Sequence, residues 1–310
     1  MQDDELTLFD AVSASTNPEN DLQSAESLLS LMSLPGIGSG RALRLAEGFN
    51  SWDALLSATP EEVRRVARAR VDIGWRPAPP EVPASSYVVG WFQNGYPLAL
   101  KDIPNPPAVL WVRGDLRPDE RCVAIVGTRS PTQWGTSMAA SIAAEAAGVG
   151  VCVVSGLAKG IDIAAHRAAL QSGGRTVAVL GSGVDRPTPF EHERDAQSIL
   201  ESGGAVISEM PPGTVPSARS LVSRNRIQSG LSFATIVVQC ATNSGTMHTA
   251  RFAREQNRRV ASPVPPDNES ELDTNSGNLE LCRPAFDTAQ VTPPAQALTS
   301  REALRALLTA

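Results

Sequence analysis

Five short segments carry glycines, hydroxyls or cations in combinations that suit the binding of an anion. Glycines allow backbone N–H groups to approach an anion at the start of a helix, and a nearby cation strengthens the contact. Three of these segments directly follow apolar, β-like runs: Gly127-Thr128-Arg129-Ser130, Ser155-Gly156-Leu157-Ala158-Lys159 and Gly181-Ser182-Gly183. The chemistry that this pattern predicts is recognition of phosphate groups.

The fourth and fifth segments add arginines and further hydroxyls. Their residues are Ser223-Arg224-Asn225-Arg226-Ile227 and Asn243-Ser244-Gly245-Thr246. Two guanidinium groups at a helix start could hold phosphates through side chains and backbone together. The alternative is that the two arginines are surface cations, or that one of them pairs with Glu209.

Each loop taken alone is better explained as a tight turn between a strand and a helix. Three such loops in register, two of them with a cation, favour an anion site. The chain has neither a G-x-G-x-x-G fingerprint nor a Walker A motif, so the sequence does not support a nucleotide cofactor. Asp162 and Glu209 are interpreted as a turn-fixing residue and an arginine partner, and no catalytic group is predicted. The four cysteines lack the spacing of a zinc site, so no metal is expected.

The elements that position these segments follow a regular alternation. Apolar runs predict strands at 122–126, 151–154, 176–180, 205–208, 235–239 and 259–262, and between most of them lie predicted helices near 135–148, 161–172, 190–202 and 246–257. This pattern is typical of an α/β fold with a Rossmann-like, doubly wound and mainly parallel sheet, here over residues 121–287. The loops that leave the carboxyl ends of such strands meet at one edge, where ligands bind.

The residues before the sheet have a different character. Residues 1–20 are expected to be a flexible tail, and residues 21–75 a small all-helical domain. In that domain Leu34-Pro35-Gly36-Ile37-Gly38 predicts a helix-hairpin-helix, or SAM-like, turn that is either structural or DNA-binding. Proline-rich residues 76–120 are expected to form a linker and an extended lead-in. Residues 288–310 are expected to form a Pro/Ala linker and a short C-terminal helix.

Charge is unevenly distributed along the 310 residues, although the net charge is −6. Residues 1–120 carry 10 basic and 17 acidic side chains, residues 121–262 carry 14 and 9, and residues 263–310 carry 3 and 7. The predicted sheet therefore holds a net +5, which is compatible with a nucleic-acid partner. With no long apolar stretch and an acidic N-terminus, the protein is expected to be cytoplasmic and without membrane contact.

Read together, the segments resemble the DNA-processing protein A family, also called DprA or Smf. The resemblance rests on VAIVGTR, VVSGLAKGIDIAAHRAAL, TVAVLGSGVD, GAVISEMPPGT, RNRIQSGLS and SGTMHTARFARE, which occur in the order of that family. It implies a Rossmann-like homodimer that binds single-stranded DNA in natural transformation, protects it and helps to load the RecA recombinase. The family is not known as an enzyme, and the resemblance implies no cofactor.

The resemblance also assigns roles to residues. Arg129 and Lys159 fall where the family contacts DNA phosphates, and Arg224, Asn225 and Arg226 match its RNR segment. The chain departs from the family at Leu221-Val222, where the usual Phe-Pro supplies a ring that stacks on a base. It also has Gln239 in place of an acidic residue, and the winged-helix domain that some members carry is not expected.

Two other functions stay open at this point. One is nucleotide binding or hydrolysis, as in related Rossmann-like proteins of the lysine-decarboxylase-like (LOG) group, whose P-G-G-x-G-T signature is partly echoed at Asn243-Ser244-Gly245-Thr246. The other is a diverged protein-interaction scaffold that has lost DNA binding.

Overall fold

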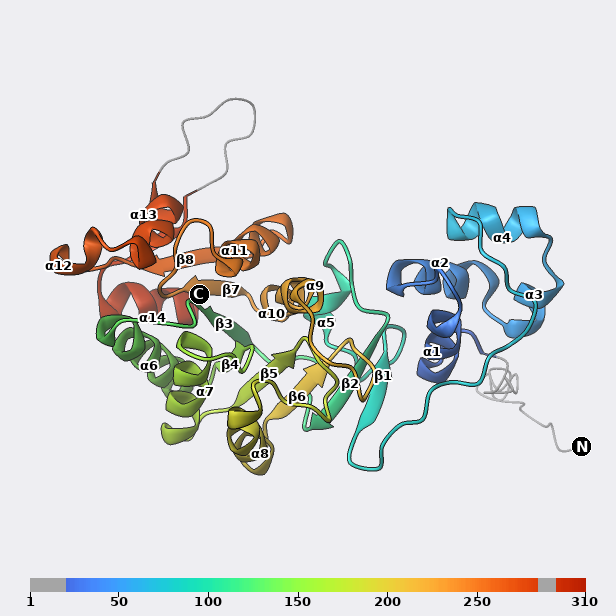
Figure 1. The fold of residues 1–310 in the computed structure, drawn as a ribbon, viewed down its shortest axis with the longest axis horizontal. Helices are drawn as coiled ribbons and strands as arrows, with labels where there is room; N and C mark the ends of the chain where they lie inside the picture. Colours follow the sequence, from blue (N-terminus) through green and yellow to red (C-terminus); the bar gives the residue numbers. More distant parts are fainter. Residues whose placement is uncertain (1–20, 284–293) are drawn as a thin grey trace, which may run out of the picture.

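A single mixed sheet organises most of the chain in the computed structural model, which describes residues 21–283 and 294–310 (Figure 1). Within these residues the strand order is β1-β2-β6-β5-β4-β3-β7-β8-β9. Strands β3 to β9 pair in parallel where they are neighbours, whereas β1 and β2 add an antiparallel edge next to β6. The strands are β1 Tyr87–Gly90, β2 Val109–Gly114, β3 Cys122–Val126, β4 Cys152–Ser155, β5 Thr176–Leu180, β6 Ala205–Ser208, β7 Ala234–Val237, β8 Arg259–Pro263 and β9 Gln296–Leu298.

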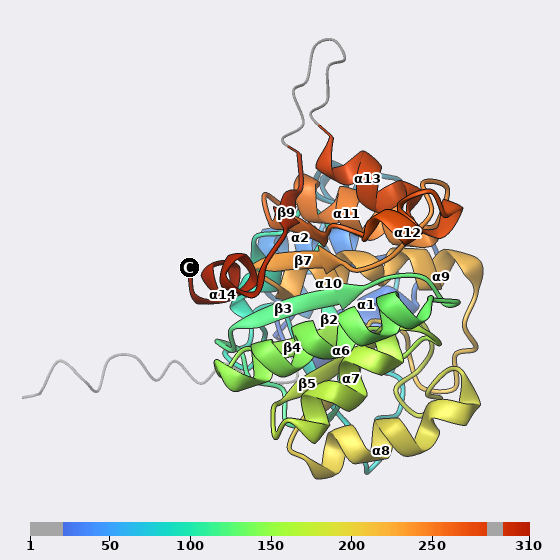
Figure 2. The same ribbon diagram turned by 90° about the vertical axis from the view of Figure 1, so that its left-hand side faces the viewer.

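Successive residues of a strand point to opposite sides of the sheet, so buried strands present two apolar faces. Helices cover both of these faces. On β4, Val153 packs with the apolar residues of α6 and α7, whereas Val154 packs with Leu100 of α5 and Ile227 of α10. One face is covered by α6 Gln133–Gly148, α7 Ile161–Gln171, α8 Glu193–Glu201 and α14 Arg301–Thr309, and the other by α5 Leu98–Lys101, α10 Asn225–Leu231 and α11 Gly245–Glu255 (Figure 2). The predicted α/β fold with a doubly wound, mainly parallel sheet is confirmed.

Among the residues described from position 21 onward, four helices precede the sheet: α1 Ala25–Ser33, α2 Ser39–Phe49, α3 Trp52–Ser57 and α4 Pro60–Ala67. The turn between α1 and α2 needs Gly36, whose φ of +78° is a region that side chains with a Cβ seldom adopt. Helix α4 begins with a capping box between Thr59 and Glu62. The apolar sides of these helices share a cluster with Val109 and fully buried Trp111 of β2, so the N-terminal helices are packed on the edge of the sheet.

The structure corrects the prediction for residues 76–120. This segment is more than a linker and lead-in, since it supplies β1, α5 and β2 and extends the sheet by two strands. The proline-rich flanks hide these strands in the sequence, because clustered prolines usually indicate irregular chain. Strand β9 was also missed.

Two expectations fall on chain that the structure does not describe. The predicted flexible tail at 1–20 lies outside the described residues, as do residues 284–293, which include the start of the predicted C-terminal linker. The predicted short C-terminal helix is present as α14, capped by Ser300. Smaller helices complete the description: the 3₁₀ turn Phe190–His192, α9 Ala218–Ser223, α12 Asp267–Ser270, the 3₁₀ turn Asp273–Asn275 and α13 Ser276–Cys282. Among the described helices none has the length and apolar character needed to cross a bilayer.

Candidate nucleic-acid interface

Four of the five predicted segments meet around one cleft of about 480 Å³. It lies at the carboxyl ends of β3, β4 and β7, between the starts of α7, α10 and α11. Its walls come from Gly127–Arg129, from Ala158 and Asp162, from α9 and α10, and from Ser244–Thr246. The prediction that distant loops converge at this edge is therefore confirmed for these four. The third segment, Gly181-Ser182-Gly183, does not line the cleft. A Cβ on Gly181 would lie 3.1 Å from the backbone of Leu221, which is part of the cleft wall.

The first segment is held rigidly by its backbone. The Thr128 N–H donates to the carbonyl of Gln239 at 2.7 Å, and the Thr128 carbonyl accepts from the Ile161 N–H at 3.1 Å. The buried Gln239 side chain in turn accepts from the Thr132 N–H at 2.9 Å, so an amide fills the place of the family's acidic residue. Arg129 is exposed on this support, and the structure shows no hydrogen bond or ion pair for its guanidinium within the described residues. Ser130 is exposed beside it.

Lys159 is the exposed cation of the second segment. Its Nζ lies 2.9 Å from Glu191 Oε1, and both side chains keep 56% of their surface exposed. The hydrogen bond from Lys159 lowers the pKa of the Glu191 carboxyl below its usual value. An ion pair this exposed contributes little free energy, so a stronger anion can replace Glu191 as the partner of Lys159.

Arg224 lies in the interior, which differs from the expected phosphate contact. The side chain is buried, and its Nη1 donates to the carbonyl of Val179 at 2.9 Å. Its Nη2 lies 3.9 Å from Asp162 Oδ2, and the same oxygen accepts from the Gly156 N–H at 3.1 Å. A Cβ on Gly156 would lie 1.4 Å from Arg224 Nη1, so the glycine makes room for the guanidinium. The charge of Arg224 is thus used to hold the second segment against α10.

Burial dominates the electrostatics of this pair. Burial raises the pKa of the Asp162 carboxyl, and Arg224 partly offsets that rise. Burial likewise lowers the pKa of the Arg224 guanidinium, with Asp162 opposing the effect. Ser155 belongs to the same interior, since its hydroxyl donates to the Ile125 carbonyl at 2.6 Å. Asp162 as a turn-fixing residue agrees with the sequence interpretation.

Arg226 and Asn225 tie the cleft to neighbouring elements. Arg226 Nη2 lies 2.7 Å from Glu209 Oε1, which confirms the pairing that the sequence offered as one alternative. Glu209 also accepts from the Ser39 hydroxyl of α2 at 2.9 Å. The amide of Asn225 donates to the Gly245 carbonyl at 3.4 Å and so links the starts of α10 and α11. Both side chains are mainly buried.

The start of α11 forms the remaining wall. Ser244 is the N-cap residue, and Gly245 and Thr246 open the helix at the cleft. The first N–H groups of a helix have no partner within it and carry the positive end of its dipole. The backbone N–H groups of this wall can therefore donate hydrogen bonds to a phosphate oxygen without help from a side chain.

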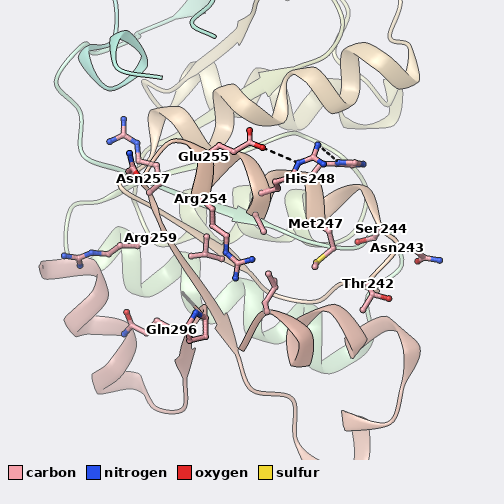
Figure 3. Close-up of a pocket in the computed structure, with 16 residues that line it drawn as sticks. Thr242, Asn243, Ser244, Met247, His248, Arg254, Glu255, Asn257, Arg259 and Gln296 are labelled. Carbon is pink, nitrogen blue, oxygen red and sulfur yellow. Dashed lines mark hydrogen bonds and ion pairs between the residues drawn. The ribbon is translucent and has the colours of Figure 1, made fainter. Parts of the chain in front are cut away.

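A second, larger cavity of about 1360 Å³ lies on the other side of α11 (Figure 3). Figure 3 shows Arg254 reaching toward its middle, and the described residues that line it include four arginines and one carboxylate, that of Glu255. Ser244 lines both cavities. The sequence pattern does not reveal this cavity, because three of its arginines, at positions 251, 254 and 259, fall within the predicted helix 246–257 and strand 259–262, and Arg258 falls between the two.

One group of potential metal ligands occurs among the described residues, far from the cleft in the fold. It consists of Glu120, Cys122 and Cys152 at the opposite ends of β3 and β4. A hydrogen bond between the two thiols, together with burial, raises the pKa of Cys152 well above its usual value, and Glu120 is bound to Arg175. The contacts of these three side chains favour a structural role over metal binding.

Comparison with known proteins gives curated relatives that match about half of the chain. Protein Smf from Escherichia coli K12 is 43% identical over 172 residues, which are 55% of this chain and 46% of that protein. The chain spans about half the length of the curated relatives it matches.

Two solved structures have the same fold. DNA processing protein A from Streptococcus pneumoniae matches with a TM-score of 0.71 and 26% identity, over 91% of this chain and 97% of that one. A structure of DNA processing protein A from Helicobacter pylori, described for its single-stranded DNA binding mode, matches with a TM-score of 0.62 and 27% identity, over 72% of this chain and 96% of that one.

The sequence profile of the DNA recombination-mediator protein A family matches residues 87–298, from β1 to β9. This range holds the whole sheet and every segment that lines the cleft. The chain belongs to the DNA recombination-mediator protein A family.

Proposed function

We propose that the chain binds single-stranded DNA in the cleft at the carboxyl ends of β3, β4 and β7. The observation that carries the proposal is the convergence of four separate segments around this cleft, with Arg129 exposed on its rim. Phosphates are bound by Arg129, by Lys159 after it exchanges Glu191, and by the first N–H groups of α11. The Helicobacter pylori relative, described for its single-stranded DNA binding, supports this choice of ligand.

The predicted site residues divide into two roles under this proposal. Gly127, Thr128, Arg129, Ser130, Lys159, Ser244, Gly245 and Thr246 form the contact surface. Arg224 and Asn225 are mainly buried residues of the cleft wall, and together with Ser155, Gly156 and Arg226 they hold the contact surface in place. The protein acts by binding rather than by catalysis, since the Asp162 carboxylate in the cleft is already engaged by Gly156 and Arg224.

The family resemblance extends the proposal to the cell. The chain would act in the cytoplasm as a homodimer that protects incoming DNA during natural transformation and helps to load the RecA recombinase. Each of these steps needs the cleft to release DNA again. Contacts made largely through phosphates are reversible, because cations in solution compete with the protein for the phosphates.

A titration tests the proposal. Fluorescence anisotropy of a labelled oligo-dT is measured at two salt concentrations with the wild type, Arg129→Ala, Lys159→Ala and Arg259→Ala. Each of the first two variants should weaken binding and reduce the slope of log K against log salt by about 0.7, the value for one phosphate contact on a single strand. Arg259→Ala is the matched control, because it removes an exposed arginine from the second cavity.

Three results would contradict the proposal. Binding that does not depend on salt would exclude a phosphate surface. If Arg259→Ala reduced the affinity for oligo-dT as much as Arg129→Ala, the DNA-binding site would be assigned to the second cavity. No measurable binding by a folded protein would favour the interaction scaffold.

A further inference from the structure

Phe190 is the most exposed large apolar side chain among the described residues, with 80% of its surface open to solvent. Single exposed apolar residues are common, so exposure alone assigns no role. The surroundings of this ring are more informative. Phe190 opens a short 3₁₀ turn that follows β5, at the same carboxyl edge of the sheet as the cleft.

The turn that carries Phe190 is fixed to the second segment by two contacts. The buried ring of His192 bonds through Nδ1 to the Leu157 carbonyl at 2.7 Å. Glu191 pairs with Lys159 at 2.9 Å. Residue 158, which adjoins these two partners, lines the cleft. The exposed ring therefore has a firm base beside the cation that is proposed to bind phosphate.

The cleft itself lacks an aromatic surface. Its lining side chains, all of them described residues, include no ring, and Leu221 occupies the wall near Gly181. A single-stranded nucleic acid presents both phosphates and flat bases, and proteins that bind it pair cations with aromatic rings on which bases stack. The cleft and Lys159 supply the cations, and Phe190 supplies the ring.

We propose that Phe190 is a base-stacking subsite for single-stranded DNA, placed outside the cleft and next to Lys159. A strand whose phosphate contacts Lys159 turns a neighbouring base onto the exposed face of the ring. This inference rests on the proposed function, and it adds a contact to the base where the cleft offers contacts to the backbone.

The test compares two ligands of equal length, oligo-dT and an oligonucleotide of abasic sites, which has phosphates but no bases. Phe190→Ala should weaken binding of oligo-dT by about 5- to 150-fold, the range expected for one stacked base. It should leave binding of the abasic strand unchanged. The salt dependence should also stay unchanged, because no charge is removed.

Two further variants complete the design. Trp75→Ala is the matched control, since it removes another exposed aromatic ring, 60% open to solvent, from the segment between α4 and β1. Phe190→Trp should keep the affinity for oligo-dT and add a fluorescence signal that the DNA quenches.

The outcomes separate the subsite from the proposed function. If the wild type binds neither strand, the proposed function fails. If the wild type binds and Phe190→Ala binds oligo-dT equally well, or weakens both strands equally, the subsite is overturned. A dimer that dissociates in Phe190→Ala while oligo-dT affinity is kept would assign the ring to a protein contact and would also overturn it.

Discussion

Cationic side chains lie on both sides of the second segment, residues 155–159, and they have different roles on the two sides. On the outer side, Arg129 and Lys159 are exposed to solvent, and Lys159 can exchange its partner Glu191 for a ligand. On the inner side, Arg224 is buried against Asp162 and the Val179 carbonyl. A cation at the ligand-binding edge of a parallel sheet can thus be a contact or a support, and its burial decides which. The following predictions test that division.

The largest effect should come from the inner side. Arg224→Ala leaves the Asp162 carboxylate buried without its cation, and removing one partner of a buried pair costs about 3–5 kcal/mol. Urea unfolding at neutral pH measures the free energy. Arg129→Ala, the outer control, should change it by no more than about 0.5 kcal/mol. An Arg224→Ala variant as stable as the wild type would show that the guanidinium belongs to the outer side.

A second effect concerns His166, which lies in the interior beside Arg224. Its Nδ1 is 2.6 Å from the Thr176 hydroxyl, which itself donates to the Val153 carbonyl at 2.7 Å, so the ring donates through Nδ1–H. Burial, together with the charge of Arg224, lowers the pKa of His166 to about 3. The ring therefore stays neutral in the folded protein at pH values where the unfolded chain takes up a proton.

This difference predicts that acid destabilises the fold. Between pH 6.5, the ordinary pKa of histidine, and about 3, the unfolded chain binds one more proton at His166 than the folded protein does. Stability due to His166 is therefore fully present above pH 6.5. Below pH 6.5 the free energy of unfolding decreases by about 1.4 kcal/mol for each unit by which the pH is lowered. Unfolding of the wild type and of His166→Asn, which can still donate to Thr176, is compared at pH 7 and 5. Equal pH dependence in the two proteins would show that His166 titrates normally.

The smallest effect belongs to the outer side. Glu191→Gln removes the carboxylate that pairs with Lys159 and should strengthen oligo-dT binding by up to about fivefold, since an exposed pair is worth about 0–1 kcal/mol. Glu193→Gln, which neutralises a nearby carboxylate with no ion pair to Lys159, controls for net charge. The two variants binding alike would mean that overall charge, and not release of Lys159, sets the affinity.

Much of the fold could be predicted because it depends on local patterns. The apolar runs of β3, β5 and β6 coincide with the observed strands, and parallel topology then requires their exits to share one edge. The pattern does not predict the antiparallel strands β1 and β2, because their proline-rich flanks indicate irregular chain.

The site could be predicted only in outline. Sequence spacing brings Arg129, Lys159 and Arg224 to the same edge, but it does not say which way a guanidinium turns. That direction depends on tertiary contacts such as the space left by Gly156, which no pattern within a single segment reveals. The exposed ring of Phe190 and the arginine-lined cavity beyond α11 were missed for the same reason.

The packing of Trp111 against the N-terminal helices affects how the protein can be dissected. Trimming the chain to residues 87–298 would expose this fully buried indole and remove the Ser39 hydroxyl from Glu209. A truncated protein of that kind would have a newly exposed apolar surface at the sheet edge, which favours aggregation. Aggregation or altered DNA binding of that protein would say little about the intact molecule. Work on the separate role of the helical hairpin is better done with point substitutions on its solvent side.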